Sequence, residues 1–507
     1  MPSNKNLYRD HLLRALEHVR GEIAQDTAPL LVLTIYGLRL MADPTSPDQR
    51  LRVAAQEAWN EIIGSDAYSS HLNALRQGVQ RVFSAAFMET PAVAPTRGAR
   101  ESARELIEGV DLGSGRLVAG AFLKLTNLAQ QLQPFVSLEE RQAFAAELTH
   151  VTLGTNTQHR SALLDAHSSR SELTSVLVDI AQAFASKPPR DIYDPTAGTG
   201  GTLLKAAQAF HPAAIEPPAQ VYGQDVNRAA LYACAWRLII HDIRGIQLEV
   251  ASSLEKPVLL DEGTKRPKRF DLVVANPPMG FKPHRLDRMA IESDQFGRFQ
   301  FGPTPSVADW LFAQHALAST QPDGLAITTI APGALFRSGL AEATIRKSLV
   351  VRDNIAAVVL LPAGMSLGTS LQSAVLVLEA KKPEERRNRT VFVDGSNMAI
   401  SDELLEAVRR ALSGVRAGPS ERAFAEVSTE MILEQGGGLL PTSHLPPPNI
   451  RASLLTVAKA QEQMHEAHAE LLAAHKLFIK ALKLPPSNDQ AKPMESQLEE
   501  ESANRED

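Results

Sequence analysis

The chain has 507 residues, which is too many for a single hydrophobic core, so two or three domains are expected. Hydrophobic residues make up 44% and charged residues 22%, the composition of an ordinary globular protein. The net charge of −6 argues against a protein that grips DNA unaided, because phosphate contacts dominate that affinity. Either the basic residues gather on one face, or a partner supplies part of the affinity for DNA.

The features that report on the cellular compartment favour the cytoplasm. Cys234 is the single cysteine, so no intrachain disulfide can form and a reducing compartment fits best. The amino-terminal stretch has no apolar core followed by a small-residue cleavage site, so we expect no signal peptide. The longest apolar run, near residues 28–38, is too short to span a bilayer, so we expect no membrane segment.

Residues 1–165 are predicted to form a helical amino-terminal domain. Apolar residues recur at three- and four-residue spacing in segments 12–19, 51–63 and 117–132, with little strand-like alternation. Residues 90–100 contain Pro91 and Pro95 and are predicted to be a connecting loop.

Residues 166–440 are predicted to form a second domain of the α/β class. Short runs rich in Val and Ile alternate with helical stretches, at residues 191–193, 221–223, 270–275, 325–330, 355–361 and 374–378. This alternation is typical of a mostly parallel, Rossmann-like sheet with helices on both faces. Such a sheet binds its ligands at the carboxyl ends of the strands, so we expect the chemistry there.

One long helix is predicted for residues 450–483. A heptad frame fits Leu454, Val457, Met464, Leu471, Phe478 and Leu482, but Gln461, His468 and His475 fall in the same frame. Two interpretations therefore stay open: the helix packs on its own domain, or it forms a coiled coil with a partner. Residues 484–507 are acidic, contain Pro and Ser, and are predicted to be a disordered tail.

The first motif that indicates chemistry is a glycine-rich turn after the first predicted strand. It reads Asp194-Pro195-Thr196-Ala197-Gly198-Thr199-Gly200-Gly201-Thr202 and precedes a helical stretch. Glycines let a backbone turn sharply and approach a ligand closely. A dinucleotide fingerprint would need a third glycine where the chain has Leu203, whereas an acidic residue at the strand end suits a ligand with an ammonium group.

The next predicted strand ends in Gly223-Gln224-Asp225. A carboxylate at this place typically accepts hydrogen bonds from ribose hydroxyls. Alone, such an Asp is more often the cap of the following helix.

The most specific motif is Asn276-Pro277-Pro278-Met279, directly after an apolar strand. Two prolines fix the backbone and remove two N–H donors, so the turn presents hydrogen-bond acceptors. An exocyclic amine is a poor nucleophile because its lone pair is delocalised into the ring. If Asn276 Oδ1 and the Pro277 carbonyl accept its two hydrogens, the lone pair is directed toward a methyl donor. An ordinary loop with two prolines is the alternative.

These two motifs together resemble the N6-adenine DNA methyltransferases, and more closely the modification subunit of type I restriction–modification systems. Residues 308–315, 333–337, 345–346 and 358–362 follow the order found in that family, and the resemblance covers about residues 150–480.

The resemblance implies methyl transfer from S-adenosylmethionine to adenine N6 in double-stranded DNA, with the base flipped out. It implies that Asn276 and Pro277 activate the amine while Pro278 and Met279 shape the base pocket. The residues it implies for the cofactor are Ser169, Asp194, Thr196, Ala197, Gly198, Gly200 and Asp225. It further implies a specificity subunit as partner, with a restriction and translocation subunit as a further candidate partner.

Three positions differ from the family pattern. Met279 stands where an aromatic residue is usual, Ser169-Arg170 replaces a Thr-Pro pair, and residues 251–254 lack the expected acidic residue. These differences keep open a methyltransferase-like subunit that transfers slowly or not at all. A second alternative is methylation of a protein glutamine amide, whose chemistry needs the same acceptors, although such enzymes are generally shorter.

The segment 281–310 mixes aromatic and basic residues, including Phe281, Lys282, Arg285, Arg298 and Phe301. This mixture suits an extruded base and its flanking phosphates, although an ordinary packed loop is nearly as good an interpretation. The histidines show no pair at metal-ligand spacing, so no metal site is predicted.

Overall fold

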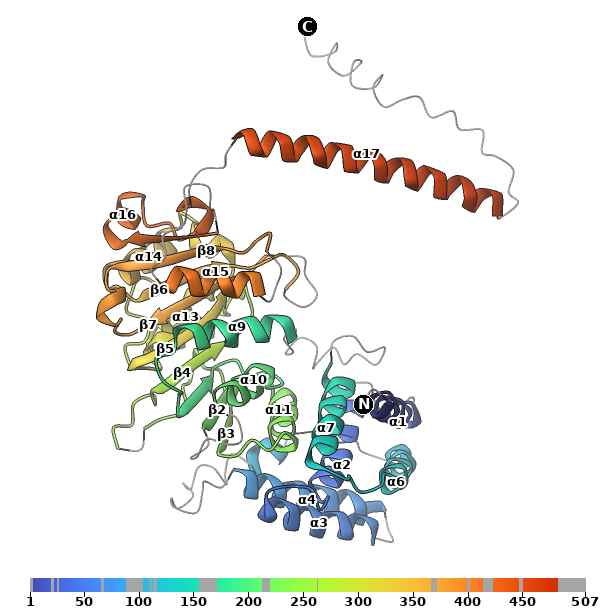
Figure 1. The fold of residues 1–507 in the computed structure, drawn as a ribbon. Helices are drawn as coiled ribbons and strands as arrows, with labels where there is room; N and C mark the ends of the chain where they lie inside the picture. The colour runs from blue at the N-terminus through green and yellow to red at the C-terminus, as the bar shows by residue number, and fades with distance from the viewer. Residues whose placement is uncertain are drawn as a thin grey trace. The chain divides into compact units, whose positions relative to one another are not determined.

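The computed structural model forms two units, residues 1–445 and residues 446–507, which are described separately (Figure 1). Among the residues that it describes, no helix has both the length and the apolar character needed to cross a membrane. The described residues are 3–19, 22–24, 27–64, 68–87, 104–108, 110, 112, 116–154, 171–211, 219–261, 263–365, 372–398, 402–413, 423–445 and 450–481.

The described part of residues 1–154 is helical, as predicted. Its long helices are α1 (Ser3–Val19), α2 (Ala28–Met41), α3 (Gln49–Ile63), α4 (Tyr68–Ala86), α6 (Arg116–Gln130) and α7 (Leu138–Leu153). In α3 the buried residues include Leu51, Ala55 and Ala58, the three- and four-residue spacing of one helix face. The predicted loop at residues 90–100 and the predicted boundary at residue 165 lie outside the described residues.

The second half of this unit is built on a nine-stranded sheet in the order β3-β2-β1-β4-β5-β7-β6-β8-β9. The strands are β1 (Asp191–Asp194), β2 (Gln220–Asp225), β3 (Ile246–Val250), β4 (Phe270–Ala275), β5 (Thr320–Ile330), β6 (Ile355–Leu360), β7 (Ala374–Glu379), β8 (Arg389–Asp394) and β9 (Phe424–Ser428). The six predicted strands are all present, and β3, β8 and β9 are additions. The predicted α/β class is therefore confirmed.

The strand order places a topological switch point between β1 and β4. The chain runs outward from β1 to β2 and β3, and then returns to pair β4 with the other side of β1. Strands β1 to β5 pair in parallel, while β7 lies antiparallel between β5 and β6. The carboxyl ends of β1 and β4 are neighbours, which is where open α/β sheets bind ligands.

Both faces of the sheet are covered, which explains the nearly continuous apolar strands. On β4, Leu272 and Val274 join the core beneath one layer of helices, whereas Val273 joins the core on the opposite face. The first layer contains α9 (Ser171–Phe184), α10 (Gly201–Phe210), α11 (Arg228–Ile240) and α15 (Asp402–Leu412). The second contains α13 (Asp309–Ala318), α14 (Leu340–Val351) and α16 (Thr429–Glu434), with α12 (Arg285–Glu292) between β4 and α13.

Helix α11 joins the sheet to the amino-terminal helices. Every residue from Ala230 to Ile240 is buried, because one side packs on β2 and β3 and the other on α2 and α7. Gly37 of α2 lies against the Trp236 ring so closely that a Cβ there would be 2.7 Å from Trp236 Cε3. Thr34 and Tyr232 are hydrogen-bonded across the same contact at 2.8 Å. The helical region is thus a packed part of this unit.

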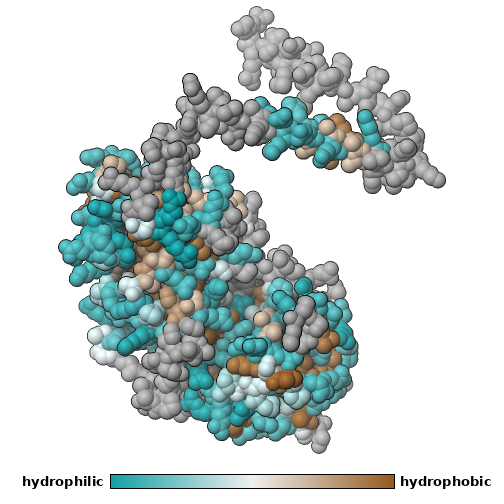
Figure 2. Space-filling view, in the orientation of Figure 1, coloured by the Kyte–Doolittle hydropathy of each residue, from teal (hydrophilic) through white to brown (hydrophobic). Residues whose placement is uncertain are grey.

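The second unit contains α17 (Ile450–Ala481), which confirms the predicted long helix to within two residues at its end. Of its side chains, residues 461–476 are described, and all of them are exposed within this unit. Figure 2 shows hydrophobic and hydrophilic side chains side by side along this part of the helix. Met464 and Leu471, seven residues apart, are exposed apolar side chains.

Candidate functional site

The two predicted motifs meet at the same edge of the sheet. Asp194 is the last residue of β1, and Asn276 directly follows β4. Because β1 and β4 are parallel neighbours, paired at Tyr193 and Val273, their carboxyl ends lie side by side. Asp225 ends β2 on the other side of β1, so the sheet brings the three predicted segments together.

The glycine-rich turn is held by backbone hydrogen bonds, one of them to β2. Ala197 N donates to Gln224 O at 3.0 Å, and Gly200 N donates to Ala197 O at 2.8 Å. Gly198 and Gly200 have φ values of 51° and 78°, in the left-handed region that favours glycine. A Cβ on Gly200 would also collide with Cys234 Sγ of α11. The turn therefore needs glycine for conformation and for space, and Gly200 caps the start of α10.

Asp194 is a buried carboxyl group at the base of this turn. It is 1% exposed, and its Oδ1 accepts from Thr196 N at 2.9 Å and from Thr196 Oγ1 at 3.3 Å. Burial raises the pKa of Asp194 from 3.8 to about 7; the Thr196 amide opposes this shift, and the nearby Asp225 charge adds to it. A cationic ligand beside Asp194 would favour its ionised form.

Asp225 joins the end of β2 to the turn. Its Oδ2 accepts from Gly198 N at 2.9 Å, and its Oδ1 accepts from Asn227 N at 2.8 Å. The helix cap expected for an isolated Asp at this position is instead Asn227, whose side chain accepts from Ala230 N. Asp225 thus fixes the glycine-rich turn against the neighbouring strand.

The loop formed by Asn276 to Met279 is partly buried and partly exposed to solvent. Asn276 and Met279 are half-buried, Pro277 is buried and Pro278 is exposed. Asn276 Oδ1 accepts a hydrogen bond from Thr329 Oγ1 of β5 at 2.7 Å. The loop ends at Gly280, which has a φ of 71° and donates its N–H to Asp309 Oδ2 at 3.3 Å.

The basic and aromatic segment after this loop is divided between surface and core. Phe281, Lys282 and Arg285 are exposed, whereas Arg298 and Phe301 are only 2% and 7% exposed. The interpretation that the segment as a whole faces nucleic acid is therefore wrong for Arg298 and Phe301. Their burial reflects packing against α13, because Phe301 N donates to Gln314 Oε1 at 3.2 Å.

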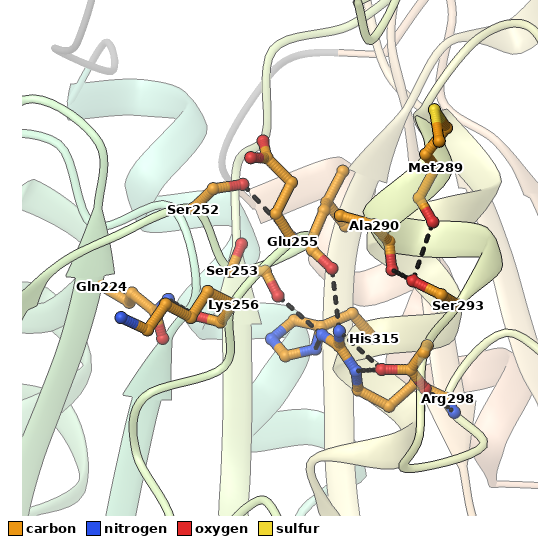
Figure 3. Close-up of polar contacts among 12 residues, drawn as sticks. Gln224, Ser252, Ser253, Glu255, Lys256, Met289, Ala290, Ser293, Arg298 and His315 are labelled. Atoms are coloured by element: carbon orange, nitrogen blue, oxygen red, sulfur yellow. Dashed lines mark hydrogen bonds and ion pairs between the residues drawn. The ribbon is translucent and has the colours of Figure 1, made fainter. Parts of the chain in front are cut away.

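Arg298 is the centre of a buried polar network (Figure 3). Its guanidinium donates to Asp294 Oδ1, to the carbonyls of Ser253 and Leu254, and to His315 Nδ1, at 2.6 to 3.0 Å. Burial, with the Arg298 charge adding, lowers the pKa of His315 well below its usual value, so the ring stays neutral. These contacts join residues 294–298 to α13 and to the loop that follows β3.

The same network reaches the strand ends beneath the glycine-rich turn. His315 Nε2 lies 3.2 Å from Tyr193 Oη on β1, and Gln224 Nε2 donates to Lys256 O at 2.9 Å. Residues 251–254, directly after β3, contain no acidic residue, and Ser252 Oγ there accepts from Glu255 N. Sequence reasoning did not identify Gln224, Arg298 or His315 in these roles, because their contacts with Lys256, Ser253 and Tyr193 join segments that are far apart in the chain.

One predicted cofactor residue, Ser169, lies outside the described residues. The others, Asp194, Thr196, Ala197, Gly198, Gly200 and Asp225, lie in the turn or at the end of β2. The predicted catalytic residues Asn276, Pro277, Pro278 and Met279 form the loop after β4. Both sets are at the switch point of the sheet.

Comparison with known sequences agrees with this arrangement. Residues 169–414 match the sequence model of the family described as N-6 DNA Methylase. Over these residues, the chain is similar to the N-6 DNA Methylase family. The N-6 DNA Methylase region contains every strand of the sheet except β9, and it includes both motifs of the site.

Named relatives of the chain are subunits of restriction enzymes. The chain is 29% identical over 248 residues to the type I restriction enzyme MjaVIII methylase subunit of Methanocaldococcus jannaschii, covering 46% of this chain and 42% of that protein. It is 30% identical over 224 residues to the MpnII methylase subunit of Mycoplasma pneumoniae, covering 42% and 39%. The matched region thus spans about two fifths of the length of these relatives.

The fold extends the similarity beyond the N-6 DNA Methylase region. The crystal structure of the type I restriction-modification system methyltransferase subunit from Streptococcus thermophilus superposes with a TM-score of 0.61 at 17% identity. The superposition covers 87% of this chain and 99% of that one. At this identity the similarity establishes a shared fold.

Proposed function

We propose that this protein transfers a methyl group from S-adenosylmethionine to the N6 of adenine in double-stranded DNA, as the modification subunit of a restriction–modification system. The observation that supports this proposal most strongly is the position of Asn276-Pro277-Pro278. This loop follows β4 at the switch point, beside the glycine-rich turn of β1. The N-6 DNA Methylase match and the restriction-enzyme relatives support DNA as the substrate.

The residues at the end of β1 fit S-adenosylmethionine. The turn from Thr196 to Gly200 leaves no room for a Cβ at Gly200, and Asp194 places a buried carboxyl group at its base. We assign the ligand ammonium group to Asp194, the ribose hydroxyls to Asp225, and the backbone contacts to Thr196, Ala197, Gly198 and Gly200. Ser169 remains a proposed cofactor residue from sequence alone. When bound, the cofactor supplies an electrophilic methyl group on a sulfonium sulfur.

The residues at the end of β4 would activate the amine. Asn276 Oδ1 and the Pro277 carbonyl each accept one hydrogen of the adenine amino group, so its nitrogen becomes more nearly tetrahedral. Pro277 and Pro278 have no N–H, so they leave acceptors facing the base. Pro278 and Met279 shape the pocket for the flipped ring. This mechanism works through position and hydrogen bonding and needs no strong base.

The proposed partners are double-stranded DNA, a specificity subunit and, in a complete restriction system, a restriction and translocation subunit. The net charge of −6 supports a partner that supplies part of the contacts to DNA phosphates. The exposed Met464 and Leu471 support α17 as the helix on which that partner docks. The single cysteine, Cys234, is buried and unpaired, which suits the reducing cytoplasm that we propose as its location.

The test is methyl transfer from labelled S-adenosylmethionine by the full chain, alone and with its co-purified partner. Phage DNA from a host that lacks adenine methylation is compared with a glutamine-containing protein substrate. The proposal expects label in DNA only, recovered as N6-methyladenine by mass spectrometry of the nucleosides. Label in the protein would favour glutamine methylation, and absence of label from both would favour an inactive subunit.

A further inference from the structure

The proposed mechanism requires that the Asn276 amide oxygen has a fixed direction. The terminal torsion of an asparagine side chain is broad and roughly two-fold, so the backbone does not fix it. Asn276 is also only half-buried, so tight packing does not hold it on every side. The orientation must come from a polar neighbour.

Thr329 is such a neighbour. It lies on β5, one residue beyond the pair formed by Ala275 and Thr328, and it is 1% exposed. Its Oγ1 donates to Asn276 Oδ1 at 2.7 Å, a good length for a hydroxyl hydrogen bond. An amide oxygen has two lone pairs, so one can accept from Thr329 while the other accepts from an amine.

A threonine is not needed at this place for the strand itself. Valine has the same branched shape, suits a strand equally well and avoids burying a hydroxyl. On the same strand, Ile327 and Ile330 are apolar and buried, while the adjacent Thr328 bonds its hydroxyl to the Thr329 carbonyl. The hydroxyl of Thr329 therefore serves its contact with Asn276.

Asp309 holds the backbone of the same loop. It is the first residue of α13 and is 4% exposed. Its Oδ2 accepts from Gly280 N at 3.3 Å, and its Oδ1 accepts from Ala331 N at 3.1 Å, directly after β5. One carboxylate thus ties the end of the Asn276 loop to the end of the strand that contains Thr329.

We propose that Thr329 and Asp309 are positioning residues for methyl transfer, Thr329 fixing the side chain of Asn276 and Asp309 fixing its loop. The inference rests on the proposed function, because it assigns to both residues the geometry in which Asn276 accepts the amine hydrogen. Neither residue touches the reacting atoms. Their effect is on how often Asn276 is correctly aimed.

The kinetic test compares Thr329→Val, Thr329→Ser and Thr328→Val in the full chain with its co-purified partner. Thr328 is a matched control, since it is also 1% exposed but its hydroxyl bonds to the carbonyl of Thr329. Thr329→Val should lower kcat by about tenfold to a hundredfold, the cost of a misplaced reacting group. The KM for S-adenosylmethionine should not change, and Thr329→Ser should restore most of kcat. Wild-type kcat in Thr329→Val, or an equal loss in Thr328→Val, would overturn the proposal.

Asp309→Asn is the second variant, because it keeps one acceptor and turns the other into a donor that faces a backbone N–H. It should lower kcat without changing the KM for S-adenosylmethionine, and unchanged kcat would overturn the role of Asp309.

Crystal structures of Thr329→Val and Thr329→Ser give a readout that needs no DNA target. The inference expects a rotated Asn276 amide in the first and an unchanged one in the second. A wild-type protein without DNA methylation would defeat the proposed function, whereas an unrotated Asn276 in Thr329→Val would defeat this inference.

Discussion

Asp194 places a carboxyl group where water is excluded and where the proposed ligand brings a positive charge. Burial raises its pKa to about 7, so the uncharged form is appreciably populated in the free protein near neutral pH. Because the pKa is higher in the folded protein than its ordinary value of 3.8, protonation of Asp194 stabilises the folded state at low pH. This contribution to stability is lost as the pH rises from 3.8 toward about 7. Binding of an ammonium group has the opposite dependence, because it needs the ionised carboxylate.

The affinity for S-adenosylmethionine should therefore increase with pH. A single carboxyl group with a pKa of about 7 predicts an affinity gain of roughly eightfold between pH 6 and pH 7.5. Calorimetric titration at both values measures it. Asp194→Asn should bind more weakly and lose most of this dependence. An equal pH dependence in that variant would assign the effect to another group.

Met279 stands at the place where the resemblance predicts an aromatic residue, and it is half-buried beside the exposed Gly280. Stacking of a base on an aromatic ring is worth about 1–3 kcal/mol. Met279→Phe should therefore hold or raise the rate of methyl transfer and tighten DNA binding. Single-turnover rates and fluorescence-anisotropy titration measure the two effects. A large loss of rate would show that the pocket is built around methionine.

At this scale, local motifs predicted Asp194, Asn276 and the glycine-rich turn, because each depends on a few adjacent residues. Thr329 and Asp309 were not predictable in the same way. Thr329 is 53 residues from Asn276 in the chain, and Asp309 is 29 residues from Gly280, its partner in the loop. Nothing in a run of Thr and Ile, or in an Asp before an apolar helix, indicates such a contact.

At the scale of elements, the Arg298 network joins three segments that surround the site. It holds residues 294–298 against α13 and against the loop after β3, and Arg298 pairs with Asp294 at 2.8 Å. Removing one member of a buried ion pair leaves an uncompensated charge, which costs more than the pair itself contributes.

Arg298→Met should therefore destabilise the protein by about 3 kcal/mol or more, because Asp294 would remain buried without its partner. Its affinity for S-adenosylmethionine should also fall, as the loop after β3 loses its anchor. Arg288→Met is the matched control: its ion pair with Glu292 is exposed, so a change within about 0.5 kcal/mol is expected. Urea unfolding compares the variants. Equal stability of the two would show that the network is not important for folding.

Strand prediction succeeded where a strand is apolar on both faces, as in β4, β6 and β7. It missed β3, where Gln247 and Glu249 alternate with apolar residues at the edge of the sheet. It also missed β9 at the opposite edge, and β8, which pairs with both β6 and β9 and is buried from Thr390 to Val393. Edge strands bury less surface, so their sequences are less distinctive.

At the scale of the whole molecule, the helical region and the sheet belong to one compact unit, residues 1–445. The sequence predicted helices there but not the burial of α11 between them and the sheet. Two contacts join residues about 200 positions apart: Gly37 with Trp236, and Thr34 with Tyr232, which are 198 residues apart. The unit has its own core without residues 446–507.

Deletion of residues 446–507 should leave cofactor binding intact and abolish assembly with the proposed specificity partner. An acidic chain binds DNA weakly and with a steep salt dependence, so sequence-specific methylation should be lost as well. Size-exclusion chromatography with the co-purified partner, and calorimetry with S-adenosylmethionine, measure both. Sequence-specific methylation by the truncated chain at physiological salt would refute the docking role of α17.

The most direct test of the central claim is Asn276→Ala in the full chain with its partner, assayed for methyl transfer and for cofactor affinity together. Asn276 is proposed to act on the amine, so methyl transfer should fall by about a hundredfold or more, on the order of 3 kcal/mol in the barrier. The affinity for S-adenosylmethionine should stay within about twofold of wild type, because the proposed cofactor residues lie at β1 and β2. Wild-type turnover by Asn276→Ala would contradict the account.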